Sequence, residues 1–338
     1  MTSGALVAPA DDAVAQLLDE GLERVEAELR EATKHADAFI DEASTHLVSA
    51  GGKRLRPLLT LLAGQLGPRG GADGAVPASD DVVKAAVVVE LTHLASLYHD
   101  DVMDEAVLRR GVDSANTRYG NTIAILIGDL LFSRASQVVA DLGTDAVRIQ
   151  AQTFERLCAG QIAETVGPSD GGDEVDHYLQ VLADKTGSLI ATAGLFGARF
   201  GGADDATVDV LRQYGERLGV AFQLADDLLD LSSQASDLGK TPGTDLREGV
   251  PTLPVLLARR STDPSDARLL ALLGGDLSDA GAHAEALALL QAHPALHEAR
   301  LETRRWADEA RDVLAPLPPG PVKDALVLLA QGVVDRTT

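Results

Sequence analysis

Two acidic clusters with the same pattern carry the clearest chemical signal in this chain. Residues 100–104 read DDVMD and residues 226–230 read DDLLD, and each cluster lies in an apolar stretch with helical spacing. An α-helix turns about 100° per residue, so carboxylates four residues apart lie on one face, one turn apart. Like charges in this arrangement repel each other and destabilise the helix. Two such clusters in apolar helices therefore predict a bound cation.

The chemistry of the cation follows from the ligands. Carboxylate oxygens are hard ligands that suit Mg²⁺, which usually binds one or two carboxylates together with oxygens of a substrate phosphate. The paired clusters predict a Mg²⁺–diphosphate site between two facing helices.

Basic residues occur at positions where a phosphate could bind. Residues 51–57 read GGKRLRP, so three cations lie between a glycine pair and the start of a helix. Glycine allows close backbone approach, a helix start offers free N–H groups, and Lys and Arg bind phosphate. A solvated basic helix start explains this heptapeptide equally well. Arg109 and Arg110 follow the first acidic cluster, where a surface pair that neutralises nearby acids is the plainer interpretation.

Further polar residues flank the second cluster. Lys185 and Thr186 interrupt an apolar helix, Gln223 precedes the cluster, and Lys240 follows it at a Gly-Lys turn. Each has an ordinary explanation, since a lysine within a helix can extend its amine to water. Together with both acidic clusters, they indicate two phosphate pockets.

The elements that must position these residues are helical. Apolar residues make up 45% of the 338 residues and aromatic residues only 3%, so Ala, Leu and Val must form the core, which favours helices. Without alternating strand patterns or a domain-sized linker, the sequence predicts one all-α domain. Helices are expected over residues 12–49, 57–65, 80–109, 122–142, 144–165, 175–200, 205–231, 267–273, 280–292, 294–314 and 321–334.

Charge and cysteine content restrict the partners and the compartment. The net charge of −23 argues against nucleic acid, whose phosphates require a basic surface, and against anionic lipid. Cys158 is the only cysteine, so no intrachain disulfide forms and a reducing compartment is expected. The sequence has no uninterrupted apolar run of 18 residues and no signal pattern. We therefore expect a cytoplasmic protein without stable membrane insertion.

From about Gly51 to Leu257 the chain resembles a trans-isoprenyl (polyprenyl) diphosphate synthase. The strings that carry the resemblance are GGKRLRP, ELTHLASLYHDDVMDEAVLRRG, YLQVLADKTGSL, GVAFQLADDLLDL and LGKTPGTDLREGVPTLP. The resemblance implies a single helical bundle of the isoprenoid synthase type with a central cavity. The catalytic core would span about residues 45–260, and a helical tail would span residues 261–338.

The resemblance also implies the metal ligands. Asp100 and Asp104 would bind Mg²⁺ directly, and Asp226 would hold a third ion once diphosphate is bound. The supporting carboxylates would be those of Asp101, Asp227 and Asp230.

Two substrates follow from the same resemblance, isopentenyl diphosphate and an allylic diphosphate. Lys53, Arg56, His93 and Arg110 would bind the first. His93 lies two helical turns before Asp100, where a core histidine is the usual expectation, so the binding role rests on the resemblance. The second substrate would be held by Arg109, Lys185 and Lys240, with Thr186 and Gln223 near the reacting carbons. The chain departs from the family at Val250, where lysine is common.

The implied reaction is head-to-tail condensation into an all-trans polyprenyl diphosphate. The positions expected to limit the product are Ala95 and Ser96, with Thr92 one turn deeper, and all three are small. These residues favour a product longer than C20, in the range C35 to C50. A bulky residue from another helix would instead give a C15 or C20 product, as in farnesyl or geranylgeranyl diphosphate synthases.

Other readings of the motifs remain open at this point. A class I terpene cyclase shares the fold type and the first motif, but it needs no isopentenyl pocket. A noncatalytic synthase subunit typically loses acidic motifs that this chain keeps. The resemblance further implies a homodimer, with residues 122–131 as a contact, although burial in the chain's own core explains that segment equally well.

Overall fold

Helix α4, which carries the first acidic cluster, spans Asp80–Met103 in this computed structural model. The Ser79 hydroxyl accepts a hydrogen bond from the Val82 N–H, and Asp80 and Asp81 occupy the first turn, where the helix dipole favours negative charge. The helix ends before Arg109, contrary to the sequence prediction. Glu105 has a left-handed φ of 50°, which cannot continue an α-helix.

The structure describes residues 11–68, 76–169, 171–232 and 242–335, and the all-α prediction is confirmed. The chain divides into two compact units, one of Met1–Glu155, Leu189–Gly215 and Val313–Leu329, the other of Arg156–Ser188, Glu216–Asp312 and Ala330–Thr338. The expected single domain therefore stays a prediction, as does the central cavity.

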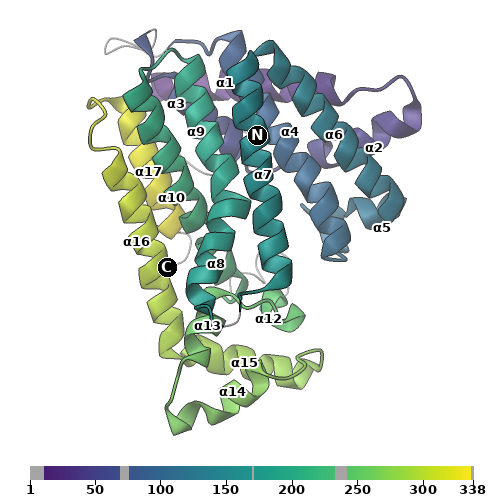
Figure 1. Ribbon diagram of the computed structural model, residues 1–338, viewed down its shortest axis with the longest axis vertical. Helices are drawn as coiled ribbons and strands as arrows, with labels where there is room; N and C mark the ends of the chain where they lie inside the picture. The colour runs from purple at the N-terminus through teal and green to yellow at the C-terminus, as the bar shows by residue number, and fades with distance from the viewer. Residues whose placement is uncertain (1–10, 69–75, 170, 233–241, 336–338) are drawn as a thin grey trace. The chain divides into compact units, whose positions relative to one another are not determined.

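In the first unit, α4 packs most extensively on α6, and the two helices run side by side in Figure 1. The range predicted as continuous over residues 12–49 is two helices, because the Asp37 carboxylate caps a new start. The helices that lie wholly in this unit besides α4 are α1 (Asp12–Thr33), α2 (Ala38–Ser49), α3 (Leu55–Gly64), α5 (Ala115–Tyr119) and α6 (Asn121–Asp141).

A small hairpin after α4 was not predicted. Strand β1 (Leu108–Arg109) pairs antiparallel with β2 (Val112–Asp113), leaving Arg110 and Gly111 as the two loop residues. Both have positive φ, 55° and 79°, as a type I′ turn requires at its two central positions. The hairpin thus places two successive arginines at and beside a tight turn.

The second unit has its own apolar core, formed by buried residues of helices that include α8, α10, α13, α15 and α16. The predicted ranges 267–273 and 280–292 match α14 and α15. Sequence inspection allowed only short helical turns within residues 232–254, where the five-residue α12 lies, and it did not predict α13. The remaining helices, some of which contribute to both units, are α7 (Thr144–Val166), α8 (Glu174–Leu182), α9 (Ser188–Phe200), α10 (Asp205–Asp230), α12 (Thr244–Glu248), α13 (Leu253–Arg259), η4 (Pro264–Asp266), α14 (Ala267–Leu273), α15 (Ala280–Ala292), α16 (Pro294–Val313) and α17 (Pro321–Asp335).

The predicted helix over residues 175–200 contains an irregular segment. Between α8 and α9, Ala183–Gly187 form a π-helical turn, η3, in which Lys185 and Thr186 lie. Such turns inside α-helices occur frequently at functional sites. The interruption noticed in the sequence is therefore also an interruption of the backbone pattern.

Helix α6 is, within the described ranges, the one helix long and apolar enough by composition to cross a membrane. In its most apolar window, 33% of the residues are buried in the protein. A core helix of a water-soluble protein passes the same test, and α6 packs on α4 and α5. Length and composition are therefore weak evidence for a membrane span.

Helices α3 and α9 approach closely enough to require glycine, which generates a stability prediction. A Cβ on Gly197 would lie 2.2 Å from the Thr60 carbonyl oxygen and 2.8 Å from the Ala63 Cβ. Gly197→Ala should therefore lower the free energy of unfolding by about 3 kcal/mol, since the contact is with backbone. Gly274→Ala is the control, because its Cβ would meet nothing closer than 3.5 Å. Equal urea midpoints for the two variants would contradict the expectation.

Candidate active site

The basic loop before α3 has an unusual backbone. Gly51 and Gly52 have φ values of 82° and 144°, and Arg54 has a φ of 50° immediately before the helix starts at Leu55. Glycine adopts these angles readily, but a left-handed arginine is held by its surroundings. The loop leaves Lys53 exposed, whereas Arg56 is half-buried.

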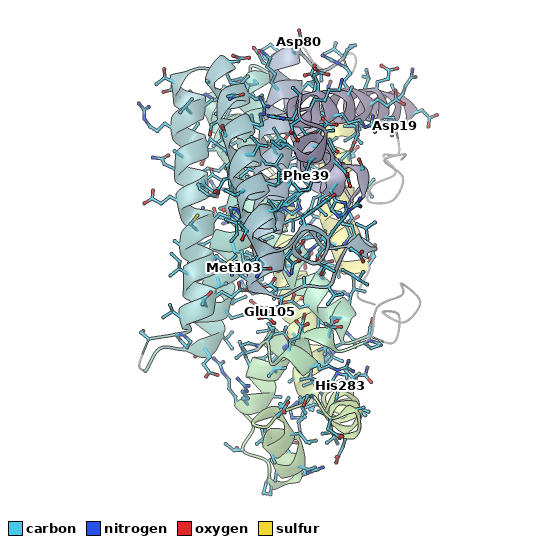
Figure 2. All side chains as sticks on the ribbon, turned by 90° about the vertical axis from the view of Figure 1, so that its right-hand side faces the viewer. Asp19, Phe39, Asp80, Met103, Glu105 and His283 are labelled. Carbon is cyan, nitrogen blue, oxygen red and sulfur yellow. The ribbon has the colours of Figure 1, made fainter. Side chains whose placement is uncertain are left out.

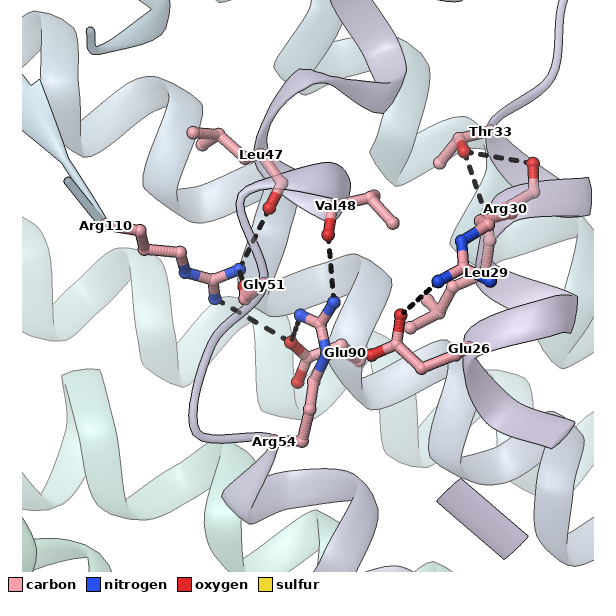
Figure 3. Close-up of polar contacts among 10 residues, drawn as sticks. All are labelled: Glu26, Leu29, Arg30, Thr33, Leu47, Val48, Gly51, Arg54, Glu90 and Arg110. Carbon is pink, nitrogen blue, oxygen red and sulfur yellow. Dashed lines mark hydrogen bonds and ion pairs between the residues drawn. The ribbon is translucent and has the colours of Figure 1, made fainter. Parts of the chain in front are cut away.

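The Arg54 side chain is bound on all sides (Figure 3). Its Nη1 lies 2.7 Å from Glu90 Oε1, its Nε donates to Glu26 Oε1, and its Nη2 donates to the Val48 carbonyl at 3.1 Å. Arg54 thus connects α1, α2 and α4 at the start of α3. Its three nitrogens are already occupied by protein oxygens.

Arg110 reaches the same place from the hairpin. Its Nη1 donates to the carbonyl oxygens of Leu47, at 3.1 Å, and Gly51, and its Nη2 lies 3.8 Å from Glu90 Oε1. A Cβ on Gly52 would lie 2.8 Å from the Arg110 Cζ, so this packing requires glycine. The structure therefore brings Arg110 to the GGKRLRP loop.

Arg56 and His93 complete this basic cluster. Burial, and then the charge of Arg110, lower the pKa of Arg56 to about 10, against the opposing effect of Glu90. The Arg56 Nε is buried without a hydrogen-bond partner. Burial, followed by Arg56 and Arg110, lowers the pKa of His93 well below 6.5, so its imidazole is neutral. The pocket residues predicted within the first unit thus influence one another.

Arg109 binds the first acidic cluster. Its Nε lies 2.6 Å from Asp101 Oδ1, and the Asp101 side chain is fully buried. The other Asp101 oxygen, Oδ2, is buried without a partner, and burial raises the pKa of this carboxyl. Asp100 is half-buried and Asp104 exposed. Figure 2 labels Met103 and Glu105, the exposed neighbours of Asp104 at the end of α4.

A hydrogen bond from α7 reaches Thr92, one of the three predicted chain-length residues of α4. Ala95, Ser96 and Thr92 are all buried. The Gln150 Nε2 of α7 donates to the Thr92 hydroxyl at 2.5 Å, and Gln150 Oε1 is buried without a partner. The Gln150 side chain of another helix therefore contacts Thr92, the deepest of the three predicted chain-length residues.

In the second unit, Asp227 is the buried member of the second cluster. It accepts hydrogen bonds from the Tyr178 hydroxyl and, at 2.9 Å, from Gln223 Nε2. The Thr186 hydroxyl donates to Gln223 Oε1 at 3.3 Å. Burial raises the pKa of Asp227 to about 6, while the hydrogen bonds from Tyr178 and Gln223 oppose that shift. The structure thus joins three predicted site residues in one chain of hydrogen bonds.

Asp230 fastens the loop that follows the cluster. Its carboxylate accepts hydrogen bonds from the backbone N–H groups of Thr244 and Asp245, at 3.2 and 3.0 Å. Its carbonyl accepts one from the Gly243 N–H at 2.7 Å. These bonds hold the start of α12 to the end of α10, and the metal-supporting role of Asp230 stays a prediction. Asp226 is half-buried.

Of the two lysines predicted to bind the allylic diphosphate, the structure describes Lys185. Lys185 Nζ lies 2.5 Å from Glu164 Oε2, so the π-helical turn presents a lysine that is already paired. Lys240 lies outside the described residues.

Sequence inspection overlooked three polar residues of these clusters, the buried Glu90 and Gln150 and the half-buried Tyr178. Glu90 is a lone acid in the apolar run VVVELTHL, which was a usable signal. Gln150 and Tyr178 lie in ordinary amphipathic segments without such a signal.

The acidic clusters lie in different units, Asp100 and Asp104 in the first and Asp226 in the second. Among the described residues, no three His, Cys, Asp or Glu side chains form a ready metal-binding group. The facing arrangement of the clusters, and the metal and substrate roles of their residues, stay predictions.

Comparison with known proteins defines the class of this all-α fold. With a TM-score of 0.86 and 42% identity, the structure matches a geranylgeranyl pyrophosphate synthase from Corynebacterium glutamicum, solved with calcium and isoprenyl diphosphate, over 98% of this chain and 99% of that one. A decaprenyl diphosphate synthase from Rhodobacter capsulatus matches with a TM-score of 0.85 and 36% identity, over 97% and 99% of the chains. The fold is that of the isoprenyl diphosphate synthases.

The family follows from the sequence match. The polyprenyl synthetase model matches residues 37–290, and a nonaprenyl diphosphate synthase from Mycobacterium tuberculosis is 46% identical over 99% of both chains. The chain belongs to the polyprenyl synthetase family. It is a trans-prenyl diphosphate synthase that transfers prenyl groups head to tail, so the cyclase and noncatalytic alternatives are not retained.

The low pKa of His93 has a consequence for stability. Unfolded histidine gains a proton near pH 6.5, but folded His93 resists protonation, so this residue's stabilising effect is present above pH 6.5 and lost as pH falls below it. Between pH 7 and pH 5, the wild type should lose up to about 2 kcal/mol more than His93→Gln. Urea unfolding of both proteins at the two pH values measures this difference. Parallel losses would show that His93 titrates normally.

Proposed function

We propose that this synthase condenses isopentenyl diphosphate with an allylic diphosphate and extends an all-trans chain beyond C20. The observation that carries the proposal is that the neighbouring side chains of Arg109 and Arg110 bind at two different places. The first binds buried Asp101 of the acidic cluster, and the second binds beside the GGKRLRP loop. One hairpin thus supplies a cation to each of two clusters, which suits a reaction between two diphosphates.

The available donors suit the proposed metal. Asp100 and Asp104 offer hard carboxylate oxygens one turn apart, and Asp226 offers another from the second cluster. We assign these three residues to as many as three Mg²⁺ ions, supported by Asp101, Asp227 and Asp230. When bound, Mg²⁺ would stabilise the charge that develops on the departing diphosphate. The calcium in the Corynebacterium glutamicum structure supports a divalent ion.

The chain's own residues would hold the substrates around that charge. Lys53, Arg56, His93 and Arg110 bind isopentenyl diphosphate, and neutral His93 can donate one hydrogen bond without adding charge. Arg109, Lys185 and Lys240 bind the allylic diphosphate, and Arg109 is oriented by Asp101. As the diphosphate departs, these cations stabilise its oxygens.

The carbon chemistry needs little from the protein. Thr186 and Gln223 present oxygen atoms that can stabilise a developing allylic cation, and their mutual hydrogen bond orients them. The C4 carbon of isopentenyl diphosphate attacks this cation, and a proton is then lost. No residue of the clusters is required as a base, since the released diphosphate can accept the proton.

The long product rests on the small residues of α4 and on relatives. The small side chains of Ala95 and Ser96 would leave room for a growing chain below the first cluster, and the nonaprenyl and decaprenyl synthases make long chains by name. A C15 or C20 product is the second candidate, because Gln150 lies against Thr92 and the Corynebacterium glutamicum relative is a geranylgeranyl synthase.

We also propose a cytoplasmic homodimer that contacts its second copy through α6. Ile125 and Leu126 of this helix are 43% and 56% exposed, and a second copy would cover them. Covering these residues explains the apolar character of α6 without a membrane span. The solitary Cys158 suits a reducing compartment.

A direct assay tests the proposed reaction. The purified protein, incubated with farnesyl diphosphate, labelled isopentenyl diphosphate and Mg²⁺, should release diphosphates longer than C20. EDTA should stop turnover, and added Mg²⁺ should restore it. Asp226→Asn should lower kcat by about a thousandfold, because it removes a proposed metal ligand. Turnover that continues in EDTA would refute the metal assignment.

Product length depends on the residue at position 95. Ala95→Phe should shorten the main product by at least one C5 unit, because the ring would fill the space below the first cluster. Ala95→Ser is the matched control, which adds one hydroxyl and should preserve the length. Chromatography of the dephosphorylated products measures both. An unchanged distribution in Ala95→Phe would show that this residue does not limit the chain.

A further inference from the structure

Glu90 is a buried charge that the proposed reaction does not use. It is 1% exposed and lies in the apolar middle of α4, one turn before His93. A single oxygen, Oε1, lies 2.7 Å from Arg54 Nη1 and 3.8 Å from Arg110 Nη2 (Figure 3). A buried ion pair is weak evidence for stability, because desolvation opposes the attraction, so this carboxylate calls for another explanation.

The two arginines that Glu90 joins are also the two with strained backbones. Arg54 and Arg110 have φ values of 50° and 55°, a region that residues other than glycine rarely occupy. Strained conformations persist only where surrounding contacts determine them, and they cluster at functional sites. Here the contacts are Glu90, Glu26 and the carbonyl oxygens of Leu47 and Val48 in the last turn of α2.

Glu90, Arg54 and Arg110 together form a clamp that fixes the GGKRLRP loop against the hairpin. Arg54 lies just before α3 and Arg110 at the hairpin turn, so one carboxylate couples two segments distant in sequence. Between them, Gly52 lies against the Arg110 guanidinium. Each of the three guanidinium nitrogens of Arg54 contacts a protein oxygen, whereas the buried Arg56 Nε has no partner. In this cluster Arg54 therefore has a structural role, whereas Arg56 keeps an N–H group that can still donate to an anion.

We propose that Glu90 is a positioning residue for the isopentenyl diphosphate pocket. Glu90 holds Arg54 and Arg110 in place without touching the substrate. The negative charge of Glu90 also reduces the repulsion between Arg54, Arg56 and Arg110. These three cations can therefore lie close together in the absence of bound diphosphate. The inference rests on the proposed function of this cluster. It assigns Arg54 to the clamp rather than to the substrate.

Steady-state kinetics of the full-length protein test this role. Glu90→Gln keeps the side-chain size but removes the charge, and it should raise the KM for isopentenyl diphosphate at least tenfold. The KM for farnesyl diphosphate should change less than twofold, because Arg109 is held by Asp101 instead. Glu90→Asp should retain part of the affinity. Glu302→Gln is the matched control, since Glu302 pairs with the exposed Arg305 of α16, and it should leave both KM values unchanged.

The outcomes separate positioning from stability. An unchanged KM for isopentenyl diphosphate in folded Glu90→Gln, or equal increases for both substrates, would overturn the inference. Should Glu90→Gln fail to fold, Glu26→Gln takes its place, because the half-buried Glu26 also pairs with Arg54. Glu26→Gln should raise the KM for isopentenyl diphosphate about threefold. No increase in that variant would also overturn the inference. A wild type that does not elongate farnesyl diphosphate would instead refute the proposed function.

Discussion

Pairing of buried charge along α4 is the constraint on which the first unit depends. Glu90 and Asp101 are buried in a helix that is otherwise mostly apolar, and an unpaired ionised carboxylate there would be costly. Each is paired with arginine, and all of these arginines lie outside α4. The loop before α3 and the hairpin after α4 are therefore held to this helix by charge, and their strained backbones follow from that attachment.

The second unit uses hydrogen bonds for the same purpose. Tyr178 and Gln223 surround buried Asp227, and Asp230 binds the backbone at the start of α12. In each acidic cluster one carboxylate is buried and held by neighbouring side chains, while Asp100, Asp226 and Asp230 are half-buried and Asp104 is exposed. This division suits a family whose reaction needs rigid walls around a highly charged substrate, because preorganised groups need not rearrange as charge develops.

Regular helices followed from the sequence, and irregular backbone did not. Helices α14 and α15 match their predicted ranges, and the Asp279 carboxylate caps the start of α15. The hairpin was missed, since its two-residue turn places Arg110 in a left-handed conformation and residues 108–113 carry no Asn-Gly or Asp-Gly signal. The π-helical turn at Lys185 likewise has no periodic signal of its own, although the polar residues that interrupt the apolar pattern marked its place.

The sequence by itself determined the all-α class, the family and the residue types of the site, because motif spacing and apolar periodicity are local properties of a chain. Tertiary structure alone decided that Arg54 and Arg110 share Glu90, that Arg109 binds Asp101, and that Gln150 reaches Thr92. These pairs join segments distant in sequence. Which arginine meets which carboxylate depends on helix packing and turn geometry, and neither is encoded in residue spacing.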